Sequence, residues 1–285
     1  MLATGNAVRR RRSAGTCCGN WLCVVVAEAR VAPTHWGECE IRGPVHLFRE
    51  RLLLRLFRRL LPTGKVLDAG CGSGSLALDL CRAGYAVEAV EDSAEFAALV
   101  EAKAQRFAVA DRLRVQRASV TDLPFADGSF AGLLCGEVLE HVVPEAGGDQ
   151  AAVREFHRVL QPGGVCVASV PHNPRLWDHT DEWARHVKRY RRSEFVDLFT
   201  GAGFVVERVR VWGFPLGRLY HRFLFAPWLA RTAEQELASR EARVDTRAGR
   251  SRILAEAVAL LLRFDELFAR LAWGRGIVLC ARRVD

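Results

Sequence analysis

Two carboxylates and an imidazole stand close together near the middle of the chain, at Glu137, Glu140 and His141. Residues at positions i, i+3 and i+4 share one face of a helix, so these side chains can converge on one point if the segment begins a helix. An imidazole in such a group is a candidate general base. We therefore place His141, as a base or as a ligand, at the centre of the predicted active site.

A glycine-rich turn lies upstream of this cluster. Gly70, Gly72 and Gly74 follow an apolar run that contains Asp68. Glycine lets the backbone turn sharply and lets a ligand approach without a Cβ atom in the way. The dinucleotide-binding pattern requires its third glycine at position 75, which is Ser75 here. The turn therefore disfavours a nicotinamide or flavin cofactor.

A second polar position, Glu91, follows Asp68 by 23 residues. An acid at this separation, at the end of the neighbouring strand, can reach a ribose diol. A surface position or a helix N-cap is the alternative for Glu91, but Asp92, with Glu95 three residues later, suits the N-cap better. The glycines and Glu91 together favour a nucleoside cofactor.

The elements that position these residues alternate between strands and helices. We expect strands over 65–69, 86–91, 113–117, 130–135, 165–170, 204–211 and 277–281, and helices over 44–61, 75–82, 93–107, 151–160 and 193–200. This alternation predicts an α/β fold with a doubly wound, mostly parallel sheet and helices on both of its faces. A helical insertion, with helices near 216–238 and 252–272, precedes the last strand. The predicted division is a core domain over 44–212, an insertion over 213–275 and a final strand over 276–285.

The first 43 residues have some features of a signal peptide, with four arginines at 9–12 and an apolar run over 21–27. That run is at the lower limit of about seven residues, and the polar pair at 19–20 separates it from the arginines. We expect residues 1–43 to form a poorly ordered extension.

The composition sets further limits. Half of the residues are hydrophobic and 26% are charged, which excludes disorder as the main state. No apolar run approaches the roughly 18 residues that a membrane-spanning helix needs. Nine scattered cysteines do not form a disulfide framework and favour the reducing cytosol. The net charge of +8 comes from basic residues spread along the chain, which indicates a solvated basic surface rather than a nucleic-acid site.

Five motifs occur in a characteristic order. They are VLDAGCGSG at 66–74, VEDS at 90–93, DLPF at 122–125 leading to DGSF at 127–130, EVLEHV at 137–142 and LQPGG at 160–164. Together they resemble the class I S-adenosylmethionine-dependent methyltransferases of the methyltransferase type 11 kind, over about residues 44–212 and the last strand. There is also some resemblance to the ubiquinone-pathway O-methyltransferases.

The resemblance implies a Rossmann-like sheet of seven strands whose last strand is antiparallel. It also implies a set of cofactor-binding residues around S-adenosylmethionine. Asp68 and the turn residues Gly70, Cys71, Gly72 and Gly74 would hold the methionine portion. Glu91, with Asp92 beside it, would bind the ribose hydroxyls, and Ser119 and Val120 would face the adenine. Cys135 and Glu137, at the end of the fourth strand, would complete the cofactor site. The family commonly has aspartate at position 119, so the uncharged Ser119 predicts a modestly weaker grip on the cofactor.

The acidic and imidazole cluster has two interpretations under this resemblance. In ubiquinone-pathway O-methyltransferases and small-RNA 2′-O-methyltransferases, a similar Glu-x-x-Glu-His set binds a divalent cation, and a downstream histidine often joins it. Here His186 would join Glu137, Glu140 and His141, and mixed oxygen and nitrogen ligands suit Mg²⁺, Mn²⁺ or Zn²⁺. Many metal-free members also share the pattern, with the histidine as a base or a loop residue. The candidate catalytic residues are His141, Glu140 and His186.

The acceptor side is less defined. His172 is either a catalytic or a hydrogen-bonded loop histidine, and Trp177 and Trp183 either line an acceptor pocket or pack under a loop. The basic run over 185–192 is a solvated face or a contact for an anionic group. Residues 213–230 are basic and aromatic, so they could lie at a membrane interface, cap an apolar substrate or pack as a core helix. A lid over a bulky acceptor is compatible with these choices.

The predicted function is methyl transfer from S-adenosylmethionine to a hydroxyl of a small lipophilic metabolite. Methylation at nitrogen or carbon remains open. RNA 2′-O-methylation is an alternative, although the sequence shows no evident RNA-binding appendage. A non-catalytic S-adenosylmethionine-binding protein with a regulatory or scaffold role is the alternative from another class.

Overall fold

The computed structural model describes residues 43–233 and 252–284. The prediction of a poorly ordered extension therefore lies outside the described residues, except for its last position. The same holds for positions 234–251 of the predicted insertion.

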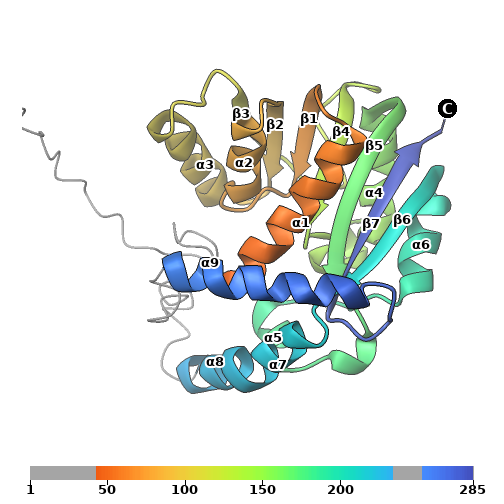
Figure 1. Cartoon of the computed structure of the whole chain (residues 1–285). Helices are drawn as coiled ribbons and strands as arrows, with labels where there is room; N and C mark the ends of the chain where they lie inside the picture. The colour runs from red at the N-terminus through yellow and green to blue at the C-terminus, as the bar shows by residue number, and fades with distance from the viewer. Residues whose placement is uncertain (1–42, 234–251, 285) are drawn as a thin grey trace, which may run out of the picture. The chain divides into compact units, whose positions relative to one another are not determined.

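A seven-stranded sheet forms the centre of the fold (Figure 1). Its strands lie in the order β3-β2-β1-β4-β5-β7-β6. The first five, β1 (Lys65–Ala69), β2 (Ala86–Glu91), β3 (Leu113–Arg117), β4 (Phe130–Gly136) and β5 (Leu160–Pro171), pair in parallel. β7 (Gly276–Arg283) lies between β5 and β6 (Phe204–Trp212) and is antiparallel to both. The predicted fold class and the antiparallel last strand are confirmed.

Helices cover both faces of this sheet because its strands are apolar on both sides. Val66 of β1 contributes to a core cluster with α1 (Pro44–Leu60), α2 (Ser75–Arg82) and α3 (Ala94–Arg106). The next residue, Leu67, points to the opposite face and joins the core cluster with α4 (Gly148–Val159) and α6 (Arg192–Thr200). Buried parallel strands characteristically read as continuous apolar runs of this kind.

Local sequence signals set most of the element boundaries. α1 begins with Pro44 in its first turn, where the missing N–H has no cost, and ends before Pro62. The structure adds α5 (His179–Ala184), which the sequence reading did not predict. It also corrects the N-cap of α3: Ser93, not Asp92, caps this helix, because the Ser93 side chain accepts a hydrogen bond from the Phe96 N–H at 3.3 Å.

The insertion is helical, as expected. It contains α7 (Leu216–Tyr220), a π-helical turn (His221–Phe225), α8 (Ala226–Ala233), α9 (Arg252–Leu261) and a 3₁₀ segment (Leu262–Phe268). α9 packs against α1 and α8 against α5 (Figure 1). Within residues 43–233 and 252–284, no helix combines the length and the apolar character needed to cross a bilayer.

Candidate cofactor and catalytic site

The glycine-rich turn connects β1 to α2 at the carboxyl edge of the sheet. The N–H groups of Gly70 and Cys71 donate to the Val90 carbonyl at 3.0 and 2.9 Å, which ties the turn to β2. A Cβ atom on Gly70 would lie 2.6 Å from a methyl group of Val138, so only glycine fits there. Gly72 has a φ of +52° and open space where a Cβ atom would project. The turn thus presents bare backbone to a ligand at this edge.

Glu91 ends β2 beside this turn. Its carboxylate accepts hydrogen bonds from the N–H of Gly72 at 2.8 Å and from the N–H of Ser93 at 3.1 Å. Burial raises the pKa of Glu91 to about 6, against the lowering effect of the Ser93 N–H. Glu91 thus lies at the end of β2, where a residue that binds the ribose was expected, whereas the neighbouring Asp92 is exposed.

Asp68 is the most perturbed acid of the predicted cofactor site. Only 2% of its surface is exposed, and its Oδ2 atom has no hydrogen-bond partner. Burial raises the pKa of Asp68 to about 8, and the charges of Glu50 and Glu91 add to this rise. A buried carboxyl oxygen without a partner is costly, so this position fits a site completed by a cationic ligand.

Three side chains of α1 reach the same edge and were missed by the sequence reading. His46 Nε2 lies 2.9 Å from Glu50 Oε1, and Ser75 at the start of α2 donates to that same oxygen. Arg49, which lies between His46 and Glu50 along α1, has its Nη1 atom 3.5 Å from Glu137 Oε2. The i, i+3, i+4 spacing of these polar residues on a largely apolar helix was the available signal.

The predicted catalytic cluster assembles from two distant segments. Ligand atoms of Glu140, His141 and His186 all lie within 4.8 Å of one another. The His141 and His186 rings are 4.9 Å apart between centroids, and His186 Nε2 is 4.0 Å from Glu140 Oε1. Glu140 is fully buried, and neither of its carboxylate oxygens has a hydrogen-bond partner. This unsatisfied carboxylate fits a cation.

Electrostatics in the cluster follow from this packing. Burial, and then the charge of Glu137, raise the pKa of Glu140 well above its ordinary value. Burial of the ring nitrogens, and then the charge of a protonated His186, lower the pKa of His141. His141 is therefore neutral near pH 7, which is the form that serves as a base or a metal ligand.

His186 is oriented by a residue that the sequence reading missed. Its Nδ1 atom lies 2.8 Å from Oδ1 of Asp181 on α5, and Asp181 is fully buried. Arg189 Nε also donates to Asp181 Oδ1 at 2.8 Å. A carboxylate behind a histidine fixes the ring and leaves the other nitrogen, here Nε2, facing Glu140, as is usual for metal-binding histidines.

Glu137 does not join the cluster, contrary to the prediction that it is a fourth metal ligand. Its carboxylate accepts a hydrogen bond from Ser169 Oγ at 2.9 Å and faces Arg49. The helix on which convergence of all three side chains was conditional is absent: Glu137 has a φ of +59° and only the 3₁₀ turn Leu139–His141 follows. Glu137 thereby lies on the α1 side, while Glu140 turns inward.

The remaining predicted residues occupy varied environments. Ser119 is exposed, and its Oγ lies 2.8 Å from Thr121 Oγ1, next to the largely buried Val120. The Cys135 side chain is fully buried in the core cluster, so it does not project from the edge. His172 is buried, with Nδ1 2.9 Å from the Tyr190 carbonyl, which agrees with a hydrogen-bonded loop histidine.

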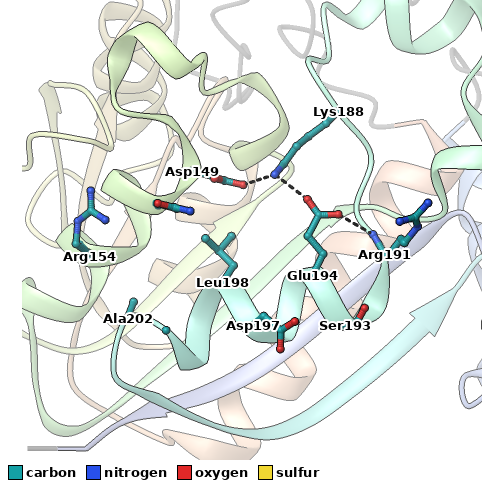
Figure 2. Close-up of a pocket in the computed structure, with 11 residues that line it drawn as sticks. Asp149, Arg154, Lys188, Arg191, Ser193, Glu194, Asp197, Leu198 and Ala202 are labelled. Atoms are coloured by element: carbon teal, nitrogen blue, oxygen red, sulfur yellow. Dashed lines mark hydrogen bonds and ion pairs between the residues drawn. The ribbon is translucent and has the colours of Figure 1, made fainter.

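A cavity of 610 Å³ between α4 and α6 lies apart from these residues (Figure 2). Lys188 crosses it, with Nζ 2.7 Å from Asp149 Oδ2 and 2.9 Å from Glu194 Oε1. None of the predicted cofactor, catalytic or metal residues lines this cavity. Lys188 thus pairs with carboxylates of both helices across this cavity, away from the predicted site.

Comparison with known proteins agrees with this geometry. Residues 67–168 match the family model of a methyltransferase domain. A ubiquinone/menaquinone biosynthesis C-methyltransferase of Geotalea daltonii is 31% identical over 118 residues, covering 40% of this chain and 48% of that protein. A ubiquinone biosynthesis O-methyltransferase of Psychrobacter cryohalolentis is 35% identical over 127 residues, covering 44% and 48%. The chain thus spans about half the length of these curated relatives.

Solved structures share the whole architecture. The cyclase SpnF aligns with a TM-score of 0.61 at 20% identity, covering 89% of this chain and 88% of that chain, and at this identity the likeness shows the fold alone. A geranyl diphosphate methyltransferase in complex with S-adenosylmethionine aligns with a TM-score of 0.55 at 20% identity, covering 84% of this chain and 88% of that chain. The predicted resemblance is therefore confirmed: the chain carries a methyltransferase domain and has the fold of the class I S-adenosylmethionine-dependent methyltransferases.

Proposed function

We propose that this protein is an S-adenosylmethionine-dependent methyltransferase that O-methylates a small, lipophilic, hydroxylated metabolite. One observation carries the proposal. Gly70 of the glycine-rich turn is in van der Waals reach of Val138, so the cofactor turn and the segment that bears Glu140 and His141 meet at one edge of the sheet. A cofactor bound at the turn would then have its methyl group close to His141, the candidate base.

The cofactor-binding residues act by charge and shape. Asp68, with Glu50 beside it, offers a buried carboxyl that would ionise when it pairs with an α-ammonium group, while Arg49 offers a cation for the carboxylate of the same amino acid. The two Glu91 oxygens accept from the N–H groups of Gly72 and Ser93, and each keeps a second lone pair that can accept from a ribose hydroxyl. S-adenosylmethionine supplies the electrophilic methyl group on a sulfonium when bound.

Methyl transfer is an in-line displacement, so positioning and exclusion of water do much of the catalytic work. The neutral imidazole of His141 can accept the proton of an acceptor hydroxyl, and Glu140 can orient that hydroxyl. His186, fixed by Asp181, limits the motion of both groups. No covalent protein intermediate is needed.

The residues Glu140, His141 and His186 also fit a divalent cation, because the buried Glu140 carboxylate has no other partner. A cation held there would polarise the acceptor hydroxyl and lower its pKa. Glu137 is left out of this ligand set. The metal is part of the proposal and is tested separately below.

The proposed lipophilic acceptor rests on the insertion. Leu219, Phe223 and Leu224 are at least half exposed, whereas Leu229 is buried, so residues 213–230 are partly packed and partly an apolar surface. Trp177 is also 39% exposed. We propose that the chain divides into a core domain over 44–212, an insertion over 213–275 and a final strand over 276–285. The insertion would act as a lid over the acceptor, and its residues 213–230 would contact a membrane.

We propose a cytosolic location, and the state of the cysteines supports it. Those of the described residues, Cys71, Cys81, Cys135, Cys166 and Cys280, are buried and unpaired, which agrees with a reducing compartment.

The test uses S-adenosylmethionine with an isotopically labelled methyl group. The purified full chain is incubated with lipid extract, aqueous metabolites and RNA in separate reactions, and labelled products are identified by mass spectrometry. A labelled methyl ether in the lipid extract supports the proposal. Label in RNA would favour 2′-O-methylation instead, and binding of the donor without turnover in any pool would favour a non-catalytic role.

Two controls separate the roles of the residues. Glu140→Gln should keep binding of S-adenosylmethionine and lose turnover, because it alters the acceptor side only. An excess of chelator should suppress turnover reversibly if a cation takes part. Full activity in chelator would remove the metal from the proposal and leave His141 as the base.

A further inference from the structure

The outer side of the insertion carries a second apolar surface, formed by residues 252–273 of α9, the 3₁₀ segment and the turn after it. Eight of its large apolar side chains are exposed, and between Leu260 and Leu271 they recur at three- and four-residue intervals. They are Ile253, Leu254, Leu260, Leu261, Phe264, Leu267, Leu271 and Trp273, with exposed fractions from 39% to 84%.

This segment is apolar on two sides. Ala255, Ala259 and Leu262 are buried on the side where α9 (blue in Figure 1) packs against α1. A packed surface helix normally has one apolar side and one polar side. The second apolar side therefore is not explained by packing within the described residues, and a surface of this kind marks an interaction site.

The charges are arranged asymmetrically around this surface. Two carboxylates of residues 252–273 lie outside the core, and each accepts hydrogen bonds from an arginine of α1. Glu256 accepts from Arg51 at 2.6 and 2.8 Å, and Glu266 accepts from Arg55 at 2.7 Å. Arginines at 252, 263 and 270 are exposed, and Arg263 Nε lies 3.9 Å from Glu266 Oε1. The acidic residues of 252–273 are less exposed: the side chains of Glu256 and Glu266 are 36% and 20% exposed within their ion pairs, and Asp265 is buried. The outer side is thus apolar with a basic border.

We propose that residues 252–273 dock the protein on an anionic membrane surface. A helix with exposed leucine, phenylalanine and tryptophan between arginines lies in the plane of the lipid interface, with its apolar side among the acyl chains and its cations at the head groups. The charge complementarity favours this occupant over a second copy of the chain, because two copies would bring like-charged borders together. The inference does not depend on methyl transfer.

The test is co-sedimentation of the full chain with vesicles of neutral phosphatidylcholine and with vesicles that contain one quarter phosphatidylglycerol. We expect the binding to anionic vesicles to be at least tenfold tighter than to neutral ones and to weaken with salt. The double substitution of Phe264→Glu and Leu267→Glu should reduce binding to anionic vesicles at least tenfold. The control Val205→Glu alters a half-exposed apolar side chain on β6 and should leave binding unchanged.

Circular dichroism and binding of S-adenosylmethionine confirm that each variant is folded. The proposal is overturned if the double variant binds anionic vesicles as tightly as the unchanged chain, since lipid contact would then lie elsewhere. It is also overturned if vesicles are not bound and sedimentation instead shows a dimer that the double variant dissociates. Loss of methyl transfer with vesicle binding intact would count against the proposed function only.

Discussion

Replacing Asp68 by asparagine should make the unliganded protein more stable while weakening its cofactor binding. In the folded chain, burial raises the pKa of Asp68 to about 8 from its ordinary 3.8. Between these two values the folded state binds a proton that the unfolded state releases, so this carboxyl lowers stability increasingly as the pH rises from 3.8 to 8. Asparagine does not titrate and removes that penalty.

The magnitude follows from the same shift. Each pH unit between 3.8 and 8 costs about 1.4 kcal/mol of stability, so the penalty reaches about 4 kcal/mol at pH 7. Over the two units from pH 5 to pH 7, the gain from Asp68→Asn, measured as the free energy of unfolding in urea, should therefore grow by about 3 kcal/mol. Asp122→Asn, at an exposed position, is the control and should give no such growth.

The cofactor side of this prediction has the opposite sign. A carboxylate paired with an ammonium group contributes about 1.5–3 kcal/mol, so Asp68→Asn should weaken binding of S-adenosylmethionine by a factor of about 10 to 100 in calorimetric titration. Such a trade of stability for function is common at binding sites. A stability gain that is the same at pH 5 and pH 7 would refute the electrostatic reasoning, and unchanged affinity would refute the role of Asp68.

Three further changes test separate parts of the site. Glu91→Gln should weaken S-adenosylmethionine about tenfold by calorimetry, because a neutral amide is a poorer acceptor for a ribose hydroxyl; an unchanged dissociation constant would refute that role. Asp181→Asn should lower kcat but leave cofactor affinity unchanged, because it frees the His186 ring, and a normal kcat would show that the ring needs no such support. Asp178→Ala should lower the free energy of unfolding by about 1–2 kcal/mol, because Asp178 caps α5 and lies 2.8 Å from His221 of the insertion, and unchanged urea unfolding would contradict this.

The sequence predicted the sheet closely because several of its strands, such as β1 and β4, are short apolar runs between strong turn signals. β1, α2, β2 and β3 have the predicted bounds, and β4 extends one residue further than expected. The glycine-rich turn and Glu91 were also predictable, since their spacing follows from the parallel pairing of β1 with β2. These features are local, or depend on one neighbouring strand.

The parts of the site that could not be predicted depend on contacts between segments that are far apart in the sequence, or on backbone angles that spacing does not specify. Glu50 lies in a helix that otherwise reads as a cover for the sheet, and only the packing of α1 on α2 brings it to Ser75. Asp181 lies in a short helix between β5 and α6 that has no strong periodic signal. The separation of Glu137 from Glu140 depends on one backbone angle, the positive φ at Glu137, which spacing alone does not specify.

The central claim is that the carboxyl edge of β1, β2 and β4 holds S-adenosylmethionine beside the cluster of Glu140, His141 and His186. A crystal structure of the full chain with S-adenosylhomocysteine tests it most directly. We predict the ribose against Glu91, the amino acid portion against Asp68 and the sulfur atom facing the cluster. Density for the nucleoside elsewhere on the molecule, or with its sulfur turned away from His141, would contradict the account.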